Sequence, residues 1–407
     1  MSEAIRPFLK MLRNFSQLAA SMLAISLTLS PFTVSPLAAA PHIVVDLDSG
    51  QVLSDQQAFD PWHPASLTKL MTAYSVFRAI TNGSARADQA VRISRNAAKQ
   101  PPSRIGYRVG TTMTLDNALK LLLVKSANDV SVAIAESVSG SVPRFAQQMT
   151  RDARQLGMSG SQFVNPHGLH DRRQVTTARD MALLVQALHK TYPQYRAMFE
   201  TPSVLAPRRT KNGKTIQRLY YSYNLLLERY RGADGFKTGF VCASGYNFIG
   251  SATRSGRRIA AVVMGRDSQT SRAVDAAKLM TEGFQQPLNA GQPIDKLQPG
   301  GAVPTGPRNM RNTICTQQAR AARYEPGAGQ AVIESPWLLK REITRSPLQV
   351  SLLGRATALA ALARVPLPNF RPASAIQPTK LEPVEPVAKV AEVGKSPIPL
   401  PSFRPSS

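Results

Sequence analysis

PASLTKLMTA, residues 64–73, combines a hydroxyl, Ser66, and a cation, Lys69, three positions apart at the start of an apolar-periodic run. Pro64 precedes the run, and its apolar residues recur at helical spacing, which predicts a helix over 65–80. Residues three apart lie on the same face of a helix, so the two side chains are expected to be neighbours. By itself the pair has two interpretations: ordinary helix-start chemistry, since Ser is a favoured N-cap, or a nucleophile with its base.

The residues around this stretch predict one α/β domain. Residues 42–55 indicate a strand, a turn at 48–50 and a second strand. A short turn joins the last two of three later strands, which favours an antiparallel sheet. We therefore expect a globular domain over 41–290, with an antiparallel sheet flanked by helices. Its other expected elements are helices at 115–138, 145–158, 176–190 and 271–284, and strands at 232–240, 246–253 and 258–265.

Two further short motifs lie in the same region. S-A-N occupies residues 126–128, and K-T-G occupies residues 237–239 at the end of an expected strand. Each motif is common alone. Together with S-x-x-K, in this order and within one α/β domain, they are typical of penicillin-binding proteins and class A β-lactamases.

The first two motifs contain residue types that acyl transfer needs. A Ser hydroxyl is a poor nucleophile unless a base takes its proton. Lys69 can be that base for Ser66 only when it is neutral, which requires a lowered pKa, and both burial and nearby cations lower the pKa of a Lys. Ser126 would relay a proton to the leaving amine, and the Asn128 amide would hydrogen-bond the substrate backbone.

The third motif supplies charge and access. Lys237 adds a positive charge that lowers the pKa of Lys69 and attracts a carboxylate, to which Thr238 offers a hydroxyl. Gly239 lets an extended substrate approach the strand without a side chain in the way. Backbone N–H groups would form the oxyanion hole.

Longer stretches of the same region strengthen this interpretation. The chain resembles the D-alanyl-D-alanine carboxypeptidases of the low-molecular-weight penicillin-binding protein family from about residue 43 to 285. The resemblance implies a β-lactamase/transpeptidase-like fold with a helical subdomain, a peptidoglycan pentapeptide as substrate, and acylation by β-lactam antibiotics. It implies no cofactor, and the five scattered histidines show no metal-site spacing. The stretches that carry the resemblance are HPASLTKLMTAY, GYRVGTTMTLDNALKLLLVKSANDV, FVNPHGL, TTARDMALL and GADGFKTGF.

The resemblance also implies roles for individual residues. Ser66 would be the acylated nucleophile, Lys69 its base and Ser126 the proton relay. The N–H groups of Ser66 and Phe240 would form the oxyanion hole.

An Arg downstream of the last strand often helps to hold the substrate carboxylate in this family. Arg272 is the best positional candidate for that role, with Arg266 as its rival. Val241 departs from the pattern, because the family often has a Thr or Ser after K-T-G-x.

Three other functions remain open. A class A β-lactamase needs a Glu between the second and third motifs, whereas residues 163–177 contain no Glu and a single carboxylate, Asp171. A peptidoglycan D,D-endopeptidase would use the same residues on cross-links. A non-enzymatic wall-binding protein would depend on the basic tail, although the intact motif set argues against an inactive site.

The N-terminus indicates export. Arg6, Lys10 and Arg13 precede an uncharged apolar run at 18–29 and the small-residue stretch PLAAAP at 36–41. These three parts are typical of a secretory signal peptide, which we expect over 1–40, with an uncleaved anchor as the alternative. The protein is thus expected in the periplasm or cell envelope. There the only two cysteines, at 242 and 315, could form one bridge.

The sequence after 290 predicts a basic, Pro-rich and largely disordered tail, 291–407. It ends in a near-repeat, VPLPNFRPAS at 365–374 and IPLPSFRPSS at 398–407. Residues 346–364 could form a basic amphipathic helix on a membrane surface, or a short packing helix. A net charge of +25 favours an anionic cell-wall or membrane partner. Nucleic acid is not expected, because the sequence has no zinc-finger spacing and no aromatic-rich basic motif.

Overall fold

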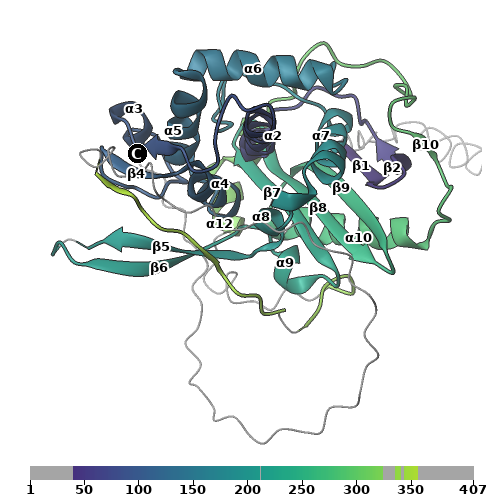
Figure 1. The fold of residues 1–407 in the computed structure, drawn as a ribbon. Helices are drawn as coiled ribbons and strands as arrows, with labels where there is room; N and C mark the ends of the chain where they lie inside the picture. The colour runs from purple at the N-terminus through teal and green to yellow at the C-terminus, as the bar shows by residue number, and fades with distance from the viewer. Residues whose placement is uncertain (1–39, 211, 324–334, 341–342, 356–407) are drawn as a thin grey trace, which may run out of the picture. The chain divides into compact units, whose positions relative to one another are not determined.

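The structure, a computed structural model, describes residues 40–210, 212–323, 335–340 and 343–355 (Figure 1). The expected signal peptide at 1–40 therefore lies outside the described residues except for its last position. The near-repeat at 365–374 and 398–407 lies outside them as well. None of the helices in the described ranges is long and apolar enough to span a bilayer.

A six-stranded antiparallel sheet forms the centre of the domain, in the order β10-β2-β1-β9-β8-β7. The strand–turn–strand expected at 42–55 and the three later strands are all confirmed. Strand β10 was not expected. The strands are β1 (His42–Asp46), β2 (Gln51–Gln56), β7 (Ala233–Val241), β8 (Gly245–Arg254), β9 (Arg257–Arg266) and β10 (Gln292–Pro293).

Helices cover both faces of this sheet, because its strands are apolar on both sides. Ile43 and Val45 belong to one buried cluster and Val44 to another, as alternation along a strand requires. The cluster around Val44 contains small residues of α10 (Gln269–Gln285), and the cluster around Ile43 contains side chains of α7 (Ala178–Thr191). Figure 1 shows α10 and α7 on opposite sides of the sheet.

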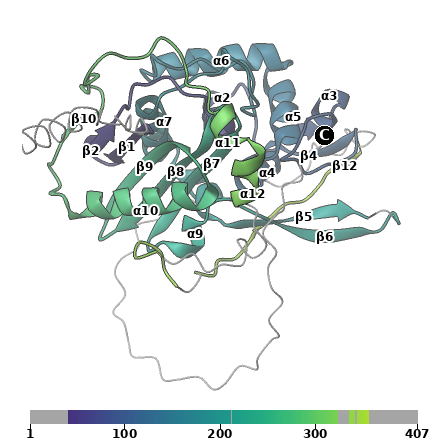
Figure 2. The same cartoon turned by 180° about the vertical axis from the view of Figure 1, so that it is seen from behind.

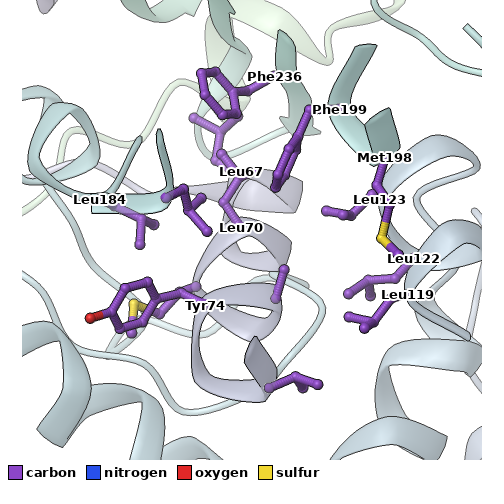
Figure 3. Close-up of a cluster of buried hydrophobic side chains, with 14 of the residues drawn as sticks. Leu67, Leu70, Tyr74, Leu119, Leu122, Leu123, Leu184, Met198, Phe199 and Phe236 are labelled. Carbon is purple, nitrogen blue, oxygen red and sulfur yellow. The ribbon is translucent and has the colours of Figure 1, made fainter. Parts of the chain in front are cut away.

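A helical subdomain packs beside the sheet around α2 (Thr68–Thr81), which follows the short helix η1 (Ala65–Leu67). Leu67, Leu70 and Tyr74 belong to one buried cluster with leucines of α4, Phe199 and Phe236. In Figure 3 the Tyr74 ring points away from the α4 leucines, on the side of α2 where Leu184 lies. A helix that is buried nearly all round is held rigidly. The remaining helices are α3 (Arg95–Ala98), α4 (Leu115–Val124), α5 (Asn128–Ser139), α6 (Val142–Gln155), η2 (Pro193–Tyr195), α8 (Ala197–Glu200) and α9 (Leu226–Arg229).

The single helix expected over 115–138 is wrong: it is broken between α4 and α5. Ser126 lies in the break with a φ of +62°. The Asn128 N–H donates to the Ser103 carbonyl, and the Asp129 carboxylate accepts the N–H groups of Ile105 and Gly106. These contacts with a loop distant in sequence replace intrahelical hydrogen bonds, as polar side chains at helix ends often do.

Two small sheets were not anticipated. Strands β5 (Ser203–Arg209) and β6 (Thr215–Tyr221) form an antiparallel hairpin, and β3 (Ala90–Arg92) pairs with β4 (Thr111–Thr114). The hairpin sequences contain Pro207 and several Arg residues, which obscure the apolar alternation expected of a strand.

The expected domain boundary at 290 is corrected by the described residues that follow it. Strand β10 pairs with β2, and Cys315, after α11 (Arg311–Ile314), forms a disulfide with Cys242. Helix α12 (Gln317–Arg323) follows. Strand β11 (Leu348–Gln349) pairs in parallel with β5, and β12 (Gly354–Arg355) pairs with β4.

The helix expected over 346–364 is also wrong over its described part, because 348–349 and 354–355 are strands. Sequence patterning missed this packing because it depends on backbone pairing and on a few buried apolar side chains. These are Ile294, Leu338 and Val350. Backbone hydrogen bonds need no apolar periodicity.

Candidate active site

The turn before α2 presents Ser66 at the edge of β7. Ala65 has a φ of +48°, a left-handed conformation that is uncommon outside glycine and is found at functional sites. Gly239 of β7 lies against this turn, since a Cβ there would be 2.9 Å from the Pro64 carbonyl oxygen and 3.0 Å from the Ser66 nitrogen. Glycine at 239 is thus required by the close approach of strand and turn.

Lys69 is fully buried beside Ser66. Its Nζ lies 2.9 Å from Ser66 Oγ, 2.8 Å from Asn128 Oδ1 and 2.7 Å from the His167 carbonyl oxygen. The pairing of Ser66 with Lys69 expected from the sequence is therefore present, and one residue of the second motif joins it. Three polar atoms fix the amine in place.

Burial lowers the pKa of Lys69 well below its ordinary value, and the nearby charge of Lys237 lowers it further, although Asp129 acts in the opposite direction. Lys237 is itself buried, and its pKa is lowered to about 7 by burial and by Arg272 and Lys125. Both amines are buried, and the charge of Lys237 disfavours a charge on Lys69. The site therefore favours the neutral amine that a general base requires.

The break between α4 and α5 brings the second motif to the site. Ser126 is 4% exposed and lines the cleft together with Ser66 and Asn128. Asn128 holds its orientation by donating from Nδ2 to the Pro101 carbonyl at 2.9 Å while its Oδ1 faces Lys69. The break between α4 and α5, which the sequence did not predict, thus places the side chains of Ser126 and Asn128 in the cleft.

Arg272, at the start of α10, lies behind the third motif. Its guanidinium is buried over the Tyr246 ring and donates to the carbonyls of Gly239 and Tyr223, each at 3.4 Å. Burial lowers its pKa to about 10. The rival candidate, Arg266, instead pairs with Asp275 and does not line the cleft.

These groups share a cleft of about 110 Å³. The structure brings all of the expected site residues to it: eight of the nine line it or bond within it, and Lys237 lies buried directly behind it. The residues that line the cleft are Ser66, Pro102, Ser103, Ser126, Asn128, His167, Gly168, Leu169, Tyr223, Thr238, Gly239, Phe240, Val241, Tyr246, Gln269 and Arg272.

The loop over 163–170 completes the site and was not assigned a role from the sequence. Gln174 holds it: its Oε1 accepts the N–H groups of Val164 and Asn165, and its Nε2 donates to Thr68 Oγ1 at 2.9 Å. Burial and Lys69 lower the pKa of His167 to about 3, so its ring adds no competing charge. The signal was present in FVNPHGL, where an Asn, a Pro and a Gly mark a tight turn.

Tyr223 was also missed. Its hydroxyl lies 2.9 Å from Lys125 Nζ, which donates to it, and the ammonium also lies over the ring. Lys125 stands directly before the S-A-N motif. Tyr223 stands upstream of the K-T-G motif, with α9 between them. No pattern within either segment indicated that the two would meet.

Comparison with known proteins agrees with this geometry. Residues 30–268 match the model of the D-alanyl-D-alanine carboxypeptidase family, peptidase family S11. D-alanyl-D-alanine carboxypeptidase DacD of Escherichia coli is 34% identical over 63% of this chain and 66% of its own length. DacF of Bacillus subtilis is 31% identical over 60% of this chain and 61% of its own. The chain thus matches somewhat less than two thirds of these two relatives.

Solved structures show the same fold. DacD from Francisella tularensis superposes with a TM-score of 0.58 at 28% identity, covering 61% of this chain and 71% of its own. Penicillin-binding protein D2 from Listeria monocytogenes in its cefotaxime-bound form superposes with a TM-score of 0.53 at 31% identity, covering 61% of this chain and 98% of its own. The family model covers more than half of the chain and includes all three motifs. The chain belongs to the D-alanyl-D-alanine carboxypeptidase family of low-molecular-weight penicillin-binding proteins.

Proposed function

We propose that this protein is a serine D-Ala-D-Ala carboxypeptidase that removes the terminal D-Ala of peptidoglycan stem peptides through an acyl-enzyme on Ser66. β-Lactams would acylate the same serine. The observation that carries the proposal is the environment of Lys69, a buried amine 2.9 Å from Ser66 Oγ. A buried lysine with two hydrogen-bond acceptors and a serine hydroxyl around it is arranged for proton transfer.

The hydrogen bonds of Lys69 support its role as the base. A neutral amine has two N–H bonds and one lone pair. Asn128 Oδ1 and the His167 carbonyl oxygen can only accept hydrogen bonds, and both lie within 2.8 Å of Nζ. They therefore take up the two N–H bonds of the amine. The lone pair is then left for the third neighbour, the Ser66 hydroxyl, whose proton it takes as Oγ attacks the substrate carbonyl.

The remaining groups divide the later steps. The N–H groups of Ser66 and Phe240 would hold the oxyanion of the tetrahedral intermediate. Ser126 would pass the proton to the leaving D-Ala amine, and water would then attack the ester carbonyl to release the shortened peptide. The leaving D-Ala carboxylate would be held by Thr238 and Arg272, which line one wall of the cleft, with Lys237 adding positive charge from behind it.

A β-lactamase is the less favoured reading. Asp171 is the only carboxylate over 163–177, and Arg173 binds it through two nitrogens at 3.0 and 2.8 Å. This hydrogen bonding lowers the pKa of Asp171 to about 2, so the group is ionised but already paired. A second base for rapid deacylation is therefore not in place on this loop.

The site of action would be the cell envelope. The N-terminal pattern of a signal peptide supports export, and the Cys242–Cys315 disulfide is of the kind that persists in oxidising compartments. We also propose that the basic C-terminal segment binds an anionic wall or membrane surface, on the strength of its charge. Retention on purified cell-wall sacculi that falls as salt rises would test this, since exposed charges are screened over about 10 Å at 0.1 M.

The activity is tested with the full chain and a D-Ala-D-Ala-ended pentapeptide. Free D-Ala is measured, with Ser66→Ala as the control, and cross-linked dimers are offered in parallel to detect endopeptidase activity. We expect D-Ala from the pentapeptide with wild type only. Release that persists in Ser66→Ala, or cleavage of cross-links alone, would contradict the assignment.

A further inference from the structure

The chain returns to the catalytic cleft after α10, beyond the part that the family model matches. Cys315 is bonded to Cys242, directly after β7, and the Met310 N–H donates to the Ala243 carbonyl at 2.9 Å. Ile314 is buried at this contact. Figure 2 shows α11 and α12 on the β7 side of the sheet. The segment 308–315 is therefore fixed next to the end of the strand that carries K-T-G.

This segment brings a cation, Arg311, close to the loop that lines the cleft. Arg311 and Arg172 both act electrostatically on His170, which directly follows the cleft residue Leu169. Both arginines are exposed. The carboxylate in this group, Asp171, is already bound by the neighbouring Arg173. Beside the cleft, the guanidinium groups of Arg311 and Arg172 thus have no ion-pair partner among the described residues.

The path of a substrate leads to these charges. Its C-terminal carboxylate belongs at Thr238 and Arg272, and its scissile carbonyl at Ser66. Strand β7 stands last in the sheet order of the described residues, so an extended peptide can add along its edge. The residues upstream of the scissile bond then run past Phe240 and Val241 toward Cys242, where Arg311 is fixed.

We propose that Arg311 and Arg172 form a binding site for a free carboxylate carried by the acyl-donor part of the substrate, upstream of the scissile D-Ala-D-Ala bond. The site makes the enzyme selective for anionic stem peptides over neutral ones. This inference rests on the proposed carboxypeptidase function and names a substrate preference for the same cleft. Arg311 comes from a segment that the disulfide, the Met310–Ala243 backbone hydrogen bond and buried Ile314 hold in place.

The test compares two pentapeptides that end in D-Ala-D-Ala. They differ only in the third residue, whose side chain ends in a carboxylate in one peptide and in the matching primary amide in the other. Release of D-Ala gives kcat/KM for each. We expect wild type to favour the acid by about threefold to tenfold, as for a partly exposed ion pair. We expect this preference to fall as salt increases.

Variants locate the preference. Arg311→Gln and Arg172→Gln should each reduce it while leaving kcat/KM for the amide peptide unchanged. Arg320→Gln removes one positive charge from exposed α12, and this variant should keep the wild-type preference for the acid peptide. Equal rates for the two peptides in wild type, or an equal loss with Arg320→Gln, would overturn the inference. Absence of D-Ala release from both peptides would instead count against the proposed function itself.

Discussion

A Cβ on Gly168 would lie 1.8 Å from the carbonyl oxygen of Ala65, the residue before Ser66. The loop that supplies the His167 carbonyl to Lys69 is therefore in direct backbone contact with the turn that supplies the nucleophile. This contact therefore helps to position both Ser66 and Lys69. Gly168 also has a φ of +84°, so its conformation and its contact both require glycine.

Replacing Gly168 with Ala should disturb this positioning. Gly256 is a matched control, because it has a φ of +80° but nothing within 4 Å of the added Cβ. Gly256→Ala should lose about 1–2 kcal/mol from backbone strain, measured by urea unfolding. Gly168→Ala should lose more, because its Cβ would also overlap the Ala65 carbonyl. Only Gly168→Ala should also slow β-lactam acylation, by about 10²-fold, because small displacements of reacting groups are costly. Equal acylation by the two variants would contradict the contact's role.

The lowered pKa of Lys69 should appear in the pH dependence of stability. Between its lowered folded pKa and its unfolded value, the unfolded chain binds a proton that the folded chain does not, so stability rises with pH. Lys69→Met removes this contribution, so the slope of the unfolding free energy should fall in the pH range below the unfolded pKa, by at most about 1.4 kcal/mol per pH unit. Lys99→Met, at an exposed position, is the control and should keep the wild-type slope. An unchanged slope in Lys69→Met would show that Lys69 is protonated when folded.

Five strands of the central sheet, the central helix and the three motifs could be predicted from the sequence because their patterns are local. The break at Ser126 could not, since apolar periodicity runs through it and the break depends on Asn128 and Asp129 bonding a loop more than twenty residues away. The Lys125–Tyr223 contact and the strands at 348–355 were missed for the same reason. Their partners are distant in the chain, and no spacing within either segment indicates them.

Because the charge of Lys237 acts on Lys69, removing it should shift the pH profile of acylation. Lys237→Gln removes a positive charge that lowers the pKa of Lys69, so the acidic limb should move to higher pH, by about one unit. Lys125→Gln should not move it upward, because Lys125 lowers the pKa of Lys237 and its loss makes Lys237 more charged. Stopped-flow acylation by a fluorescent penicillin gives both profiles. An upward shift in both variants would mean that the limb belongs to another group.

The disulfide should contribute measurably to stability. It joins residues 73 apart, a separation for which chain entropy gives about 4 kcal/mol as an upper value. The double variant Cys242→Ser/Cys315→Ser should lose about 2–4 kcal/mol in urea unfolding. Reductant should bring wild type to the same value and leave the variant unchanged. Stability equal to that of oxidised wild type would show that the bridge constrains nothing.

The residues beyond α12 should stabilise the domain without entering the chemistry. Arg345 donates to the carbonyls of Glu200 and Ala233, and the Val350 N–H donates to the Leu205 carbonyl at 2.9 Å. Leu338 is buried here, and each such side chain is worth about 1.5–3 kcal/mol before the cost of ordering the segment.

Two truncated chains test this contribution. A chain ending at 355 retains all of these contacts and should match the Tm of the full chain, whereas one ending at 323 keeps the disulfide but loses them. We expect the shorter chain to be less stable by about 2–4 kcal/mol. Its kcat/KM on the pentapeptide at 25 °C should equal that of the longer chain, because no described residue after Arg272 lines the cleft. Equal Tm values for the two truncations would contradict the packing of 335–355, and a lower kcat/KM in the folded shorter chain would show that these residues also support the site.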